Sequence, residues 1–264
     1  MRVLHIGDIV DKPGRQIVVR AVRELKERER LDLVIANAEN SAAGSGMTAE
    51  NYRELTQAGV DGITMGDHIY RRQELLATLG SAKNLVKPAN FPPEAPGREF
   101  MLLETPSGAR LAVFSLLGRV FTRPVDCPWK AADRVLERLP TDVKAIIVDF
   151  HAEATSDKQL MGRYLDGRVA AVLGTHTHVP TADEQILPGG TAFQCDLGMT
   201  GPHESILGRQ IEAVMETTLT FRPTHFEVAT GDVRLNGAIV EIDEATGKAT
   251  SIRRLCVKAN QLAD

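Results

Sequence analysis

The sequence contains few cysteines, and none in a metal-binding or disulfide spacing. Only three occur among the 264 residues, Cys127, Cys195 and Cys256, and they lie far apart in the chain. An odd number of cysteines without a Cys-x-x-Cys pair argues against a disulfide framework and against a zinc ribbon. Free thiols are typical of a reducing compartment, so we predict a cytoplasmic protein.

A long apolar segment is also missing. No apolar run approaches the roughly 20 residues that a membrane-spanning helix needs. The chain passes from Met1-Arg2 directly into Val3-Leu4-His5-Ile6, without a secretory hydrophobic region or a cleavage site. We therefore expect no membrane partner.

An excess of positive charge is absent as well. The 31 Lys and Arg residues are outnumbered by 35 Asp and Glu residues, which leaves a net charge of -4. A basic surface that follows the phosphate backbone of nucleic acid is therefore not expected. A local site for one small phosphate ligand remains compatible with this charge.

What the chain does contain is the composition of an ordinary globular protein, with 43% hydrophobic and 25% charged residues. A chain of this length buries enough apolar surface to fold without disulfides or structural metals. It has no internal repeat, low-complexity tract or long linker. We predict a single domain over residues 1–264.

Apolar runs of strand length alternate with helical patterns along the first two thirds of the chain. We predict strands over residues 2–6, 33–37, 62–65, 99–104, 110–116, 144–150 and 169–173. Helices are expected from about residue 14, from an N-cap at Thr48 to just before Gly59, over 73–79 with a stop at Gly80, between 128 and 140, and over 157–165. The last third predicts a helix near 205–216 and β segments around 225–228, 238–242 and 251–257. This order indicates a layered α/β fold with one mixed sheet or two packed sheets.

Side chains able to bind metal or transfer protons follow five of these strands. They are Asp8, Glu39 and Asn40, Asp67 and His68, His151, and the pair His176 and His178. Each residue alone has a simple structural alternative, such as a loop cap or a core histidine. Because ligands of open α/β sheets gather at the carboxyl ends of strands, the agreement between five strand ends favours one common site.

The strongest single motif is Gly174-Thr175-His176-Thr177-His178. Two imidazoles spaced two residues apart beyond a buried strand can face one point, and neutral imidazole is the commonest protein ligand for transition metals. With the carboxylates, the chain offers enough ligands for two cations. Such a pair, about 3.5–4 Å apart, activates a water and clamps the oxygens of an in-line phosphoryl displacement. Glu39 is the candidate for a carboxylate that bridges both ions.

The ordered set of motifs resembles the calcineurin-like metallophosphoesterase superfamily and, more narrowly, the YmdB-like bacterial phosphodiesterases. The motifs are Gly7-Asp8, Glu39-Asn40, Gly66-Asp67-His68, His151 and Gly174-Thr175-His176-Thr177-His178, supported by Asp126-Cys127-Pro128 and Gly198-Met199-Thr200-Gly201-Pro202. The resemblance runs over nearly the full length. It implies an α-β-β-α sandwich of mixed sheets flanked by helices, and two metal ions, most often iron or manganese.

The same resemblance implies a role for each residue. One ion would be held by Asp8, Glu39, Asn40 and His178, and the other by Glu39, Asp67, His151 and His176. His68 would be the general acid that protonates the leaving oxygen. The implied reaction is hydrolysis of a small phosphodiester, with 2′,3′-cyclic nucleotides as the suggested substrates, by in-line attack of metal-bound hydroxide.

Two positions depart from the superfamily pattern. The usual Asp-x-His after the first strand is Asp8-Ile9-Val10, and Asn40 is expected to replace the missing imidazole. The usual Gly-Asn-His is Gly66-Asp67-His68, which adds a negative charge near the phosphate. That charge would favour a more charged metal pair or slow the turnover.

Other functions remain compatible with these residues. A phosphomonoesterase would use the same metal pair, and a nucleotide sensor would bind without hydrolysis, an alternative that Asp67 keeps open. Arg119 and Arg123 lie in a loop that would contact phosphate or a base, or would be ordinary surface, and His203 has no assigned role. The helix near 205–216 and the C-terminal hairpin are candidate surfaces for a homo-oligomer.

Overall fold

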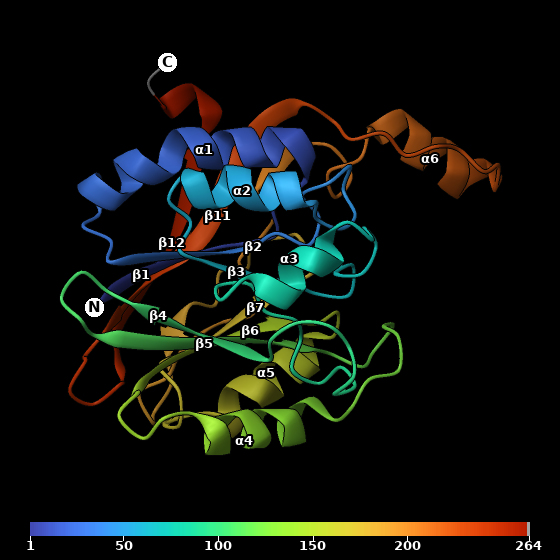
Figure 1. The fold of residues 1–264 in the computed structure, drawn as a ribbon. Helices are drawn as coiled ribbons and strands as arrows, with labels where there is room; N and C mark the ends of the chain where they lie inside the picture. The colour runs from blue at the N-terminus through green and yellow to red at the C-terminus, as the bar shows by residue number, and fades with distance from the viewer. Residues whose placement is uncertain (263–264) are drawn as a thin grey trace.

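Two mixed six-stranded β-sheets packed face to face form the centre of the computed structural model, which describes residues 1–262 (Figure 1). The first sheet has the order β10-β11-β1-β2-β3, with β12 paired to β11. Its strands are β1 (Arg2–Ile6), β2 (Leu33–Asn37), β3 (Gly62–Thr64), β10 (Gly201–Glu204), β11 (Gly231–Ile242) and β12 (Ala249–Lys258). The strands β1, β2 and β3 run parallel, whereas β11 runs antiparallel to β1. The carboxyl ends of β1, β2 and β3 therefore meet at one edge.

The second sheet has the order β4-β5-β6-β7-β9-β8. Its strands are β4 (Phe100–Glu104), β5 (Arg110–Leu117), β6 (Ala145–His151), β7 (Ala171–Thr175), β8 (Gln185–Ile186) and β9 (Ala192–Gln194). The central strands β5, β6, β7 and β9 are parallel, and the outer strands β4 and β8 are antiparallel to their neighbours. This sheet also gathers the carboxyl ends of its central strands at one edge.

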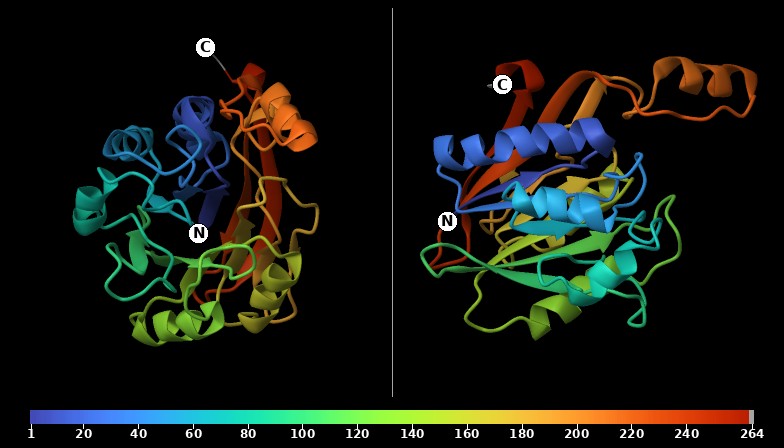
Figure 2. Two further views of the ribbon diagram at one scale, coloured as in Figure 1. Left: turned by 90° about the vertical axis from the view of Figure 1, so that its right-hand side faces the viewer. Right: turned by 45° about the horizontal axis from the view of Figure 1, so that its top comes forward.

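Helices cover the outer faces of both sheets (Figure 2). The helices around the sandwich are α1 (Asp11–Arg28), α2 (Ala49–Gln57), α3 (Leu75–Ser81), α4 (Pro128–Arg138) and α5 (Thr155–Tyr164). The chain also forms α6 (Ile211–Thr220) and a final 3-10 turn over Ala259–Gln261. Helix α1 buries Val18, Val22 and Leu25, which recur at helical spacing. Helix α2 begins with a capping box between Thr48 and Asn51. Helix α6 buries no residue and projects away from the sandwich (Figure 1).

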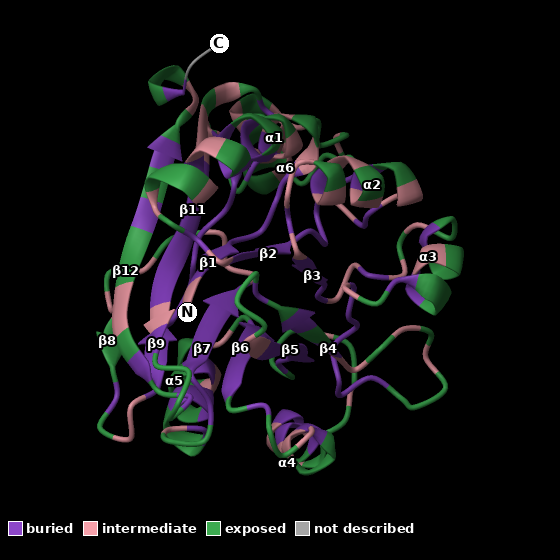
Figure 3. Cartoon of the chain, turned by 60° about the vertical axis from the view of Figure 1, so that its left-hand side comes forward, coloured by how far each residue is buried: buried purple, intermediate pink, exposed green. Residues whose placement is uncertain are grey.

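The apolar core has three layers, and strand β1 shows how the sequence divides between them. Val3 packs between the two sheets together with Ile35 and Ile147, whereas Leu4 points to the layer beneath helix α1. Alternate strand residues face opposite sides, so a strand covered on both faces is apolar throughout. Figure 3 shows the central strands of both sheets buried, whereas β12 at the edge of the first sheet and the outer faces of the helices are partly exposed. The predicted α-β-β-α sandwich is confirmed.

The C-terminal predictions were partly wrong. Residues Gly201–Glu204, just before the predicted helix, form strand β10 against β11, and helix α6 begins only at Ile211. The segment predicted as β around 225–228 is not a strand, since only Val228 forms an isolated bridge, with Arg209. The pairing partners of both segments lie elsewhere in the chain, so local periodicity could not identify them.

Two smaller predictions also need correction. Helix α3 does not stop at Gly80 but continues to Ser81. A glycine inside a helix costs only about 1 kcal/mol, and burial of Leu75 and Leu79 outweighs that cost. The short strands β8 and β9 went unpredicted because two or three residues are too few to show a period. Within the described residues no helix is long and apolar enough to cross a membrane.

Candidate metal centre

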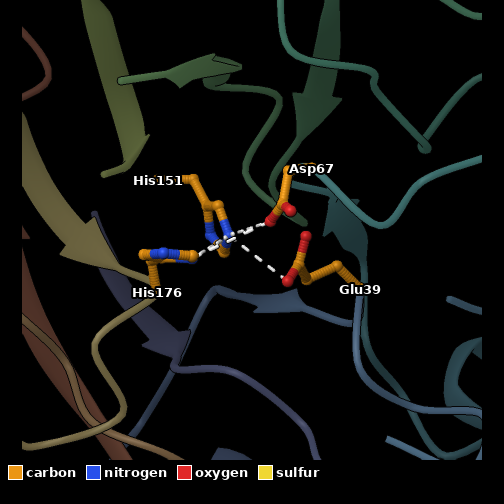
Figure 4. A group of neighbouring side chains, drawn as sticks. All are labelled: Glu39, Asp67, His151 and His176. Carbon is orange, nitrogen blue, oxygen red and sulfur yellow. Dashed lines mark hydrogen bonds and ion pairs between the residues drawn. The ribbon is translucent and has the colours of Figure 1, made fainter. Parts of the chain in front are cut away.

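The eight predicted site residues lie around one edge of the sandwich, where strands of both sheets end. Four of them, Glu39, Asp67, His151 and His176, each offer a ligand atom, and all four atoms lie within 4.8 Å of one another. Their side chains converge from four different strand ends (Figure 4). In the sequence these four residues lie up to 137 positions apart, and the two facing sheets bring them together.

His151 stands at the centre of this first group. Its Nε2 atom lies 3.3 Å from Glu39 Oε1, 3.3 Å from Asp67 Oδ1 and 3.0 Å from His176 Nδ1. Two carboxylate oxygens and two imidazole nitrogens directed at one point make the donor set that a transition metal prefers. These residues therefore fit a metal ion.

A second group adjoins the first. Asn40 Nδ2 lies 3.1 Å from Glu39 Oε1 and 3.2 Å from His178 Nε2, and His178 Nε2 lies 4.0 Å from Asp8 Oδ1. Among the described residues, Asp8 Oδ1 has no hydrogen-bond partner although Asp8 is completely buried. A buried carboxylate oxygen without a hydrogen bond is costly, and a bound cation would relieve that cost. The donor set thus fits a second ion.

Glu39 lies between the two groups. Its Oε1 atom approaches His151 on one side and Asn40 on the other, and its Oε2 atom accepts a hydrogen bond of 3.0 Å from the His68 N–H group. Glu39 is almost completely buried. This is the position that a carboxylate bridging two cations requires.

His68 lies at the exposed side of the site, with 27% of its side chain accessible. Its Nδ1 atom is 2.8 Å from Asn40 Oδ1 and 3.2 Å from Glu39 Oε1, and its Nε2 atom is 3.7 Å from Asp67 Oδ2. Burial works against protonation, but Glu39 and Asp67 outweigh it and raise the pKa of His68. A protonated imidazole facing solvent is the arrangement that a general acid needs.

The pKa values of the two buried carboxylates, Asp8 and Glu39, are shifted in opposite directions. Burial raises the pKa of Asp8 to about 6, although His178 and His151 oppose the rise. Burial acts in the same direction on Glu39, but His151 and His68 outweigh it and hold the pKa of Glu39 well below its ordinary value. Glu39 is thus kept ionised by its imidazole neighbours.

The pKa values of the imidazoles of His176 and His151 are also shifted in opposite directions. Burial lowers the pKa of His176 to about 4, and the adjacent His151 adds to that effect. Burial opposes protonation of His151 too, but Glu39 and Asp67 raise its pKa well above the ordinary value. In the metal-free protein a proton on His151 balances the carboxylates. A metal ion binding there displaces such protons, so metal binding is expected to release them.

A buried polar network beneath His151 was missed from the sequence. Thr175 Oγ1 donates to Asp149 Oδ1 at 2.6 Å, and Asp149 also accepts hydrogen bonds from Asn37 and Thr64. Because the hydroxyl proton is committed to Asp149, Thr175 Oγ1 accepts the 2.9 Å bond from His151 Nδ1. This bond leaves the Nε2 lone pair of His151 for the metal site. An acidic residue inside an apolar strand was the available signal.

Glu153 is a second residue that sequence reasoning missed. Its Oε2 atom lies 3.2 Å from His176 Nε2, on the side of the ring opposite the metal group. A proton on Nε2 is therefore paired with Glu153, while Nδ1 faces His151. Glu153 follows His151 by two positions, and this proximity to a candidate ligand was the only local signal.

The residues without an assigned role mostly have structural contacts. His203 Nδ1 donates to the Gly201 carbonyl at 3.0 Å, and its Nε2 atom accepts from Asn236 at 3.0 Å. The guanidinium of Arg119 lies 5.7 Å from the centre of the Trp129 ring. Arg123 lies near Tyr70, where it opposes the rise of the Tyr70 pKa to about 12 that burial causes.

The fold and this cluster of candidate ligands at the strand ends define a protein of the metallophosphoesterase type. The chain belongs to the YmdB-like protein family, whose model matches residues 4–255. The resemblance stated from the strand-end motifs is thereby confirmed.

Similar proteins cover nearly the whole chain. It is 43% identical over 262 residues to the 2′,3′-cyclic-nucleotide 2′-phosphodiesterase of Bacillus subtilis (strain 168), with 99% of each chain covered. A crystal structure of a hypothetical protein from Thermus thermophilus matches with a TM-score of 0.91 and 42% identity, covering 98% of this chain and 99% of that one. A crystal structure of a novel phosphatase from Mycoplasma pneumoniae matches with a TM-score of 0.91 and 34% identity, covering 98% and 93%.

Proposed function

We propose that this protein is a dinuclear metal-dependent phosphodiesterase that hydrolyses 2′,3′-cyclic nucleotides. The observation that carries the proposal is the convergence of one ligand atom each from Glu39, Asp67, His151 and His176 within 4.8 Å of one another. Beside them lies a buried Asp8 oxygen without a hydrogen-bond partner among the described residues. The 43% identity to the Bacillus subtilis phosphodiesterase over nearly the full length supports the substrate class.

The proposal assigns the ligands as two sets that share Glu39. The first set is Asp8, Glu39, Asn40 and His178, and the second is Glu39, Asp67, His151 and His176. Mixed oxygen and imidazole ligands suit iron or manganese. When bound, the two ions supply the Lewis acidity that activates a water and offsets negative charge on the phosphoryl oxygens.

His68 is the proposed general acid. In ring opening of a 2′,3′-cyclic phosphate, a water oxygen forms a bond to phosphorus and one P–O bond to the ribose breaks. The ribose oxygen then leaves as an alkoxide and needs a proton. His68 is positioned to supply it because its pKa is raised and part of its ring is exposed.

The test is release of a nucleoside monophosphate from 2′,3′-cyclic AMP by the metal-loaded protein, separated chromatographically. We expect turnover with Mn²⁺ and its loss with a chelator. If the metal-loaded protein binds the nucleotide without cleaving it, the result would favour a nucleotide sensor, the alternative that the additional negative charge of Asp67 keeps open. Faster cleavage of a phosphomonoester measured side by side would favour the phosphomonoesterase.

The proposal extends to location and partners. The three free cysteines Cys127, Cys195 and Cys256 support a cytoplasmic protein.

A homo-oligomer is proposed through helix α6, where Met215 and Leu219 are 50% and 72% exposed and no residue is buried. Light scattering is expected to give a mass above that of the 28.8 kDa chain, and Leu219→Glu is expected to lower it. A chain-sized mass for the native protein would contradict the oligomer.

A further inference from the structure

The two histidines of the Gly174–His178 motif adopt an unusual backbone conformation. His176 has a φ of 96° and His178 a φ of 65°, both in the left-handed region that residues other than glycine rarely occupy. Such conformations persist only where the surrounding structure enforces them. The loop after strand β7 therefore needs restraints that hold both imidazoles in place.

Thr177, between the two histidines, is held by Asp196. Asp196 Oδ2 accepts hydrogen bonds from the Thr177 N–H group at 3.0 Å and from Thr177 Oγ1 at 2.6 Å. Its other oxygen, Oδ1, accepts a bond of 2.8 Å from the Gly198 N–H group. Asp196 is completely buried. Its oxygens are engaged by protein donors, so it contacts the loop rather than serving as a ligand.

Lys158 neutralises this buried carboxylate. Its Nζ atom lies 2.7 Å from Asp196 Oδ2, and Lys158 is 1% exposed. A buried charge is tolerated only when it is paired, so the two residues depend on each other. Gly174 permits the close approach, because a Cβ atom there would overlap the Cys195 carbonyl oxygen and crowd the Lys158 side chain.

The segment after Asp196 adds backbone restraints on the same loop. The Leu197 N–H group donates to the Gly174 carbonyl at 2.8 Å, and the Met199 N–H group donates to the His178 carbonyl at 2.9 Å. The Thr200 N–H group donates to the carbonyl of Asp8 at 2.8 Å. The Gly198-Met199-Thr200 motif, which the proposed reaction leaves without a role, thus joins the histidine loop to Asp8.

We propose that Asp196, neutralised by Lys158, is a positioning residue that holds His176 and His178 in their ligand orientations. The inference rests on the proposed function, because it assigns these two histidines to different metal ions. One buried carboxylate then determines the geometry of both ions through Thr177. A buried ion pair that merely stabilises the fold would have no such effect on metal binding.

The experiment is a Co²⁺ titration of the metal-free full chain, followed by visible absorption and by competition with a chelator. Thr177→Val removes the hydroxyl donor to Asp196 and keeps the backbone donor, so the fold is expected to survive. We expect Co²⁺ affinity to fall by about 10- to 100-fold at both sites, which is the usual loss when a group that supports metal ligands from the outer shell is removed. The visible absorption bands are expected to change as well. Thr177→Ser keeps the hydroxyl group and is expected to bind Co²⁺ as the native protein does.

Asp196→Asn provides a second variant, and Asp133→Asn the matched control. Asp133 pairs with Arg168 at the surface, at 2.6 Å, so its loss is expected to leave Co²⁺ binding unchanged. Thermal unfolding is measured on every variant. Unchanged Co²⁺ affinity and absorption in Thr177→Val and Asp196→Asn, with only the unfolding temperature lowered, would overturn the positioning role. A native protein that binds no Co²⁺ would instead refute the proposed function, and the positioning role with it.

Discussion

Asp8 shows at the scale of one residue how a proposed metal ligand lowers the stability of the metal-free fold. Its Oδ2 atom accepts a hydrogen bond of 3.0 Å from the His176 N–H group, but its Oδ1 atom has no hydrogen-bond partner among the described residues and lies 3.7 Å from His151 Nδ1. Burial raises its pKa to about 6. Ionised Asp8 therefore destabilises the metal-free protein, and a cation bound at Asp8 would reverse this effect.

Asp8→Asn is expected to stabilise the metal-free protein at pH 8. The folded protein holds the Asp8 proton more tightly than the unfolded chain, so the stability it contributes is present at low pH and is lost as the pH rises through about 6. The difference of about two pKa units corresponds to about 3 kcal/mol at most. Chelator-treated samples melted at pH 8 and pH 4 would show a gain that shrinks toward pH 4. An equal gain at both values would contradict the assignment.

His68→Ala is expected to separate catalysis from metal binding. The variant should keep its metal content and lose about 10²- to 10⁴-fold in kcat on 2′,3′-cyclic nucleotides, the usual contribution of a general acid. A p-nitrophenyl diester, whose leaving group needs no proton, serves as the control and should be much less affected. Equal losses on both substrates would argue against the acid role.

The element scale is illustrated by strands β6 and β7, whose parallel register places His151 opposite Thr175. That register alone allows Thr175 to link Asp149 to His151. Neighbouring strands thus supply the proposed ligand His151 and the hydroxyl group that accepts its hydrogen bond. The same logic applies to the loop after β7, which the segment after β9 restrains.

Thr175→Val is expected to weaken metal retention with little change of fold. Valine keeps the branched shape suited to a strand, but His151 Nδ1 loses its hydrogen-bond acceptor. We expect a roughly 10- to 100-fold loss of Mn²⁺ affinity, measured as metal content after dialysis against graded chelator. Thr175→Ser is the control that keeps the hydroxyl. Full metal retention in Thr175→Val would exclude the orienting role.

Sequence periodicity predicted the central elements and the final strand pair β11 and β12 well, but it predicted the region from β10 to residue 228 poorly. Strands β1, β2 and β6 and helices α1 and α4 have apolar residues repeated at short intervals, so the pattern is local. Strand β10 contains Pro202 and forms because β11 lies beside it. Helix α6 buries nothing and therefore has no apolar stripe to mark its limits.

At the scale of the whole molecule, the two sheets share the apolar layer between them, to which Val3, Ile35, Val113 and Ile147 all contribute. The proposed metal ligands likewise come from both sheets. Neither sheet can therefore lose its partner without exposing core residues and dispersing the site. This shared layer supports the proposal that residues 1–264 form one domain.

We expect the metal-free protein to unfold in one calorimetric transition, and metal to raise its unfolding temperature. At a Mn²⁺ concentration about 100 times its dissociation constant, each site adds about 2.7 kcal/mol of stability. For a chain of this size that corresponds to roughly 5–10 °C per site. His176→Ala is expected to lose about half of the increase. Two separate transitions in the metal-free protein would contradict the single domain.

The sequence by itself determined the main strands, the reactive residues at their ends and the order of motifs that identifies the family. Those features can be read from neighbouring residues, because a buried strand or helix repeats apolar residues at a regular spacing and each motif is a short run of the chain. Only the tertiary structure decided that Glu39, Asp67 and His151 share one point, and that Asp149 and Asp196 lie behind the imidazoles. Their contacts join residues far apart in the chain, and a buried charge shows its partner only when the sheets have packed.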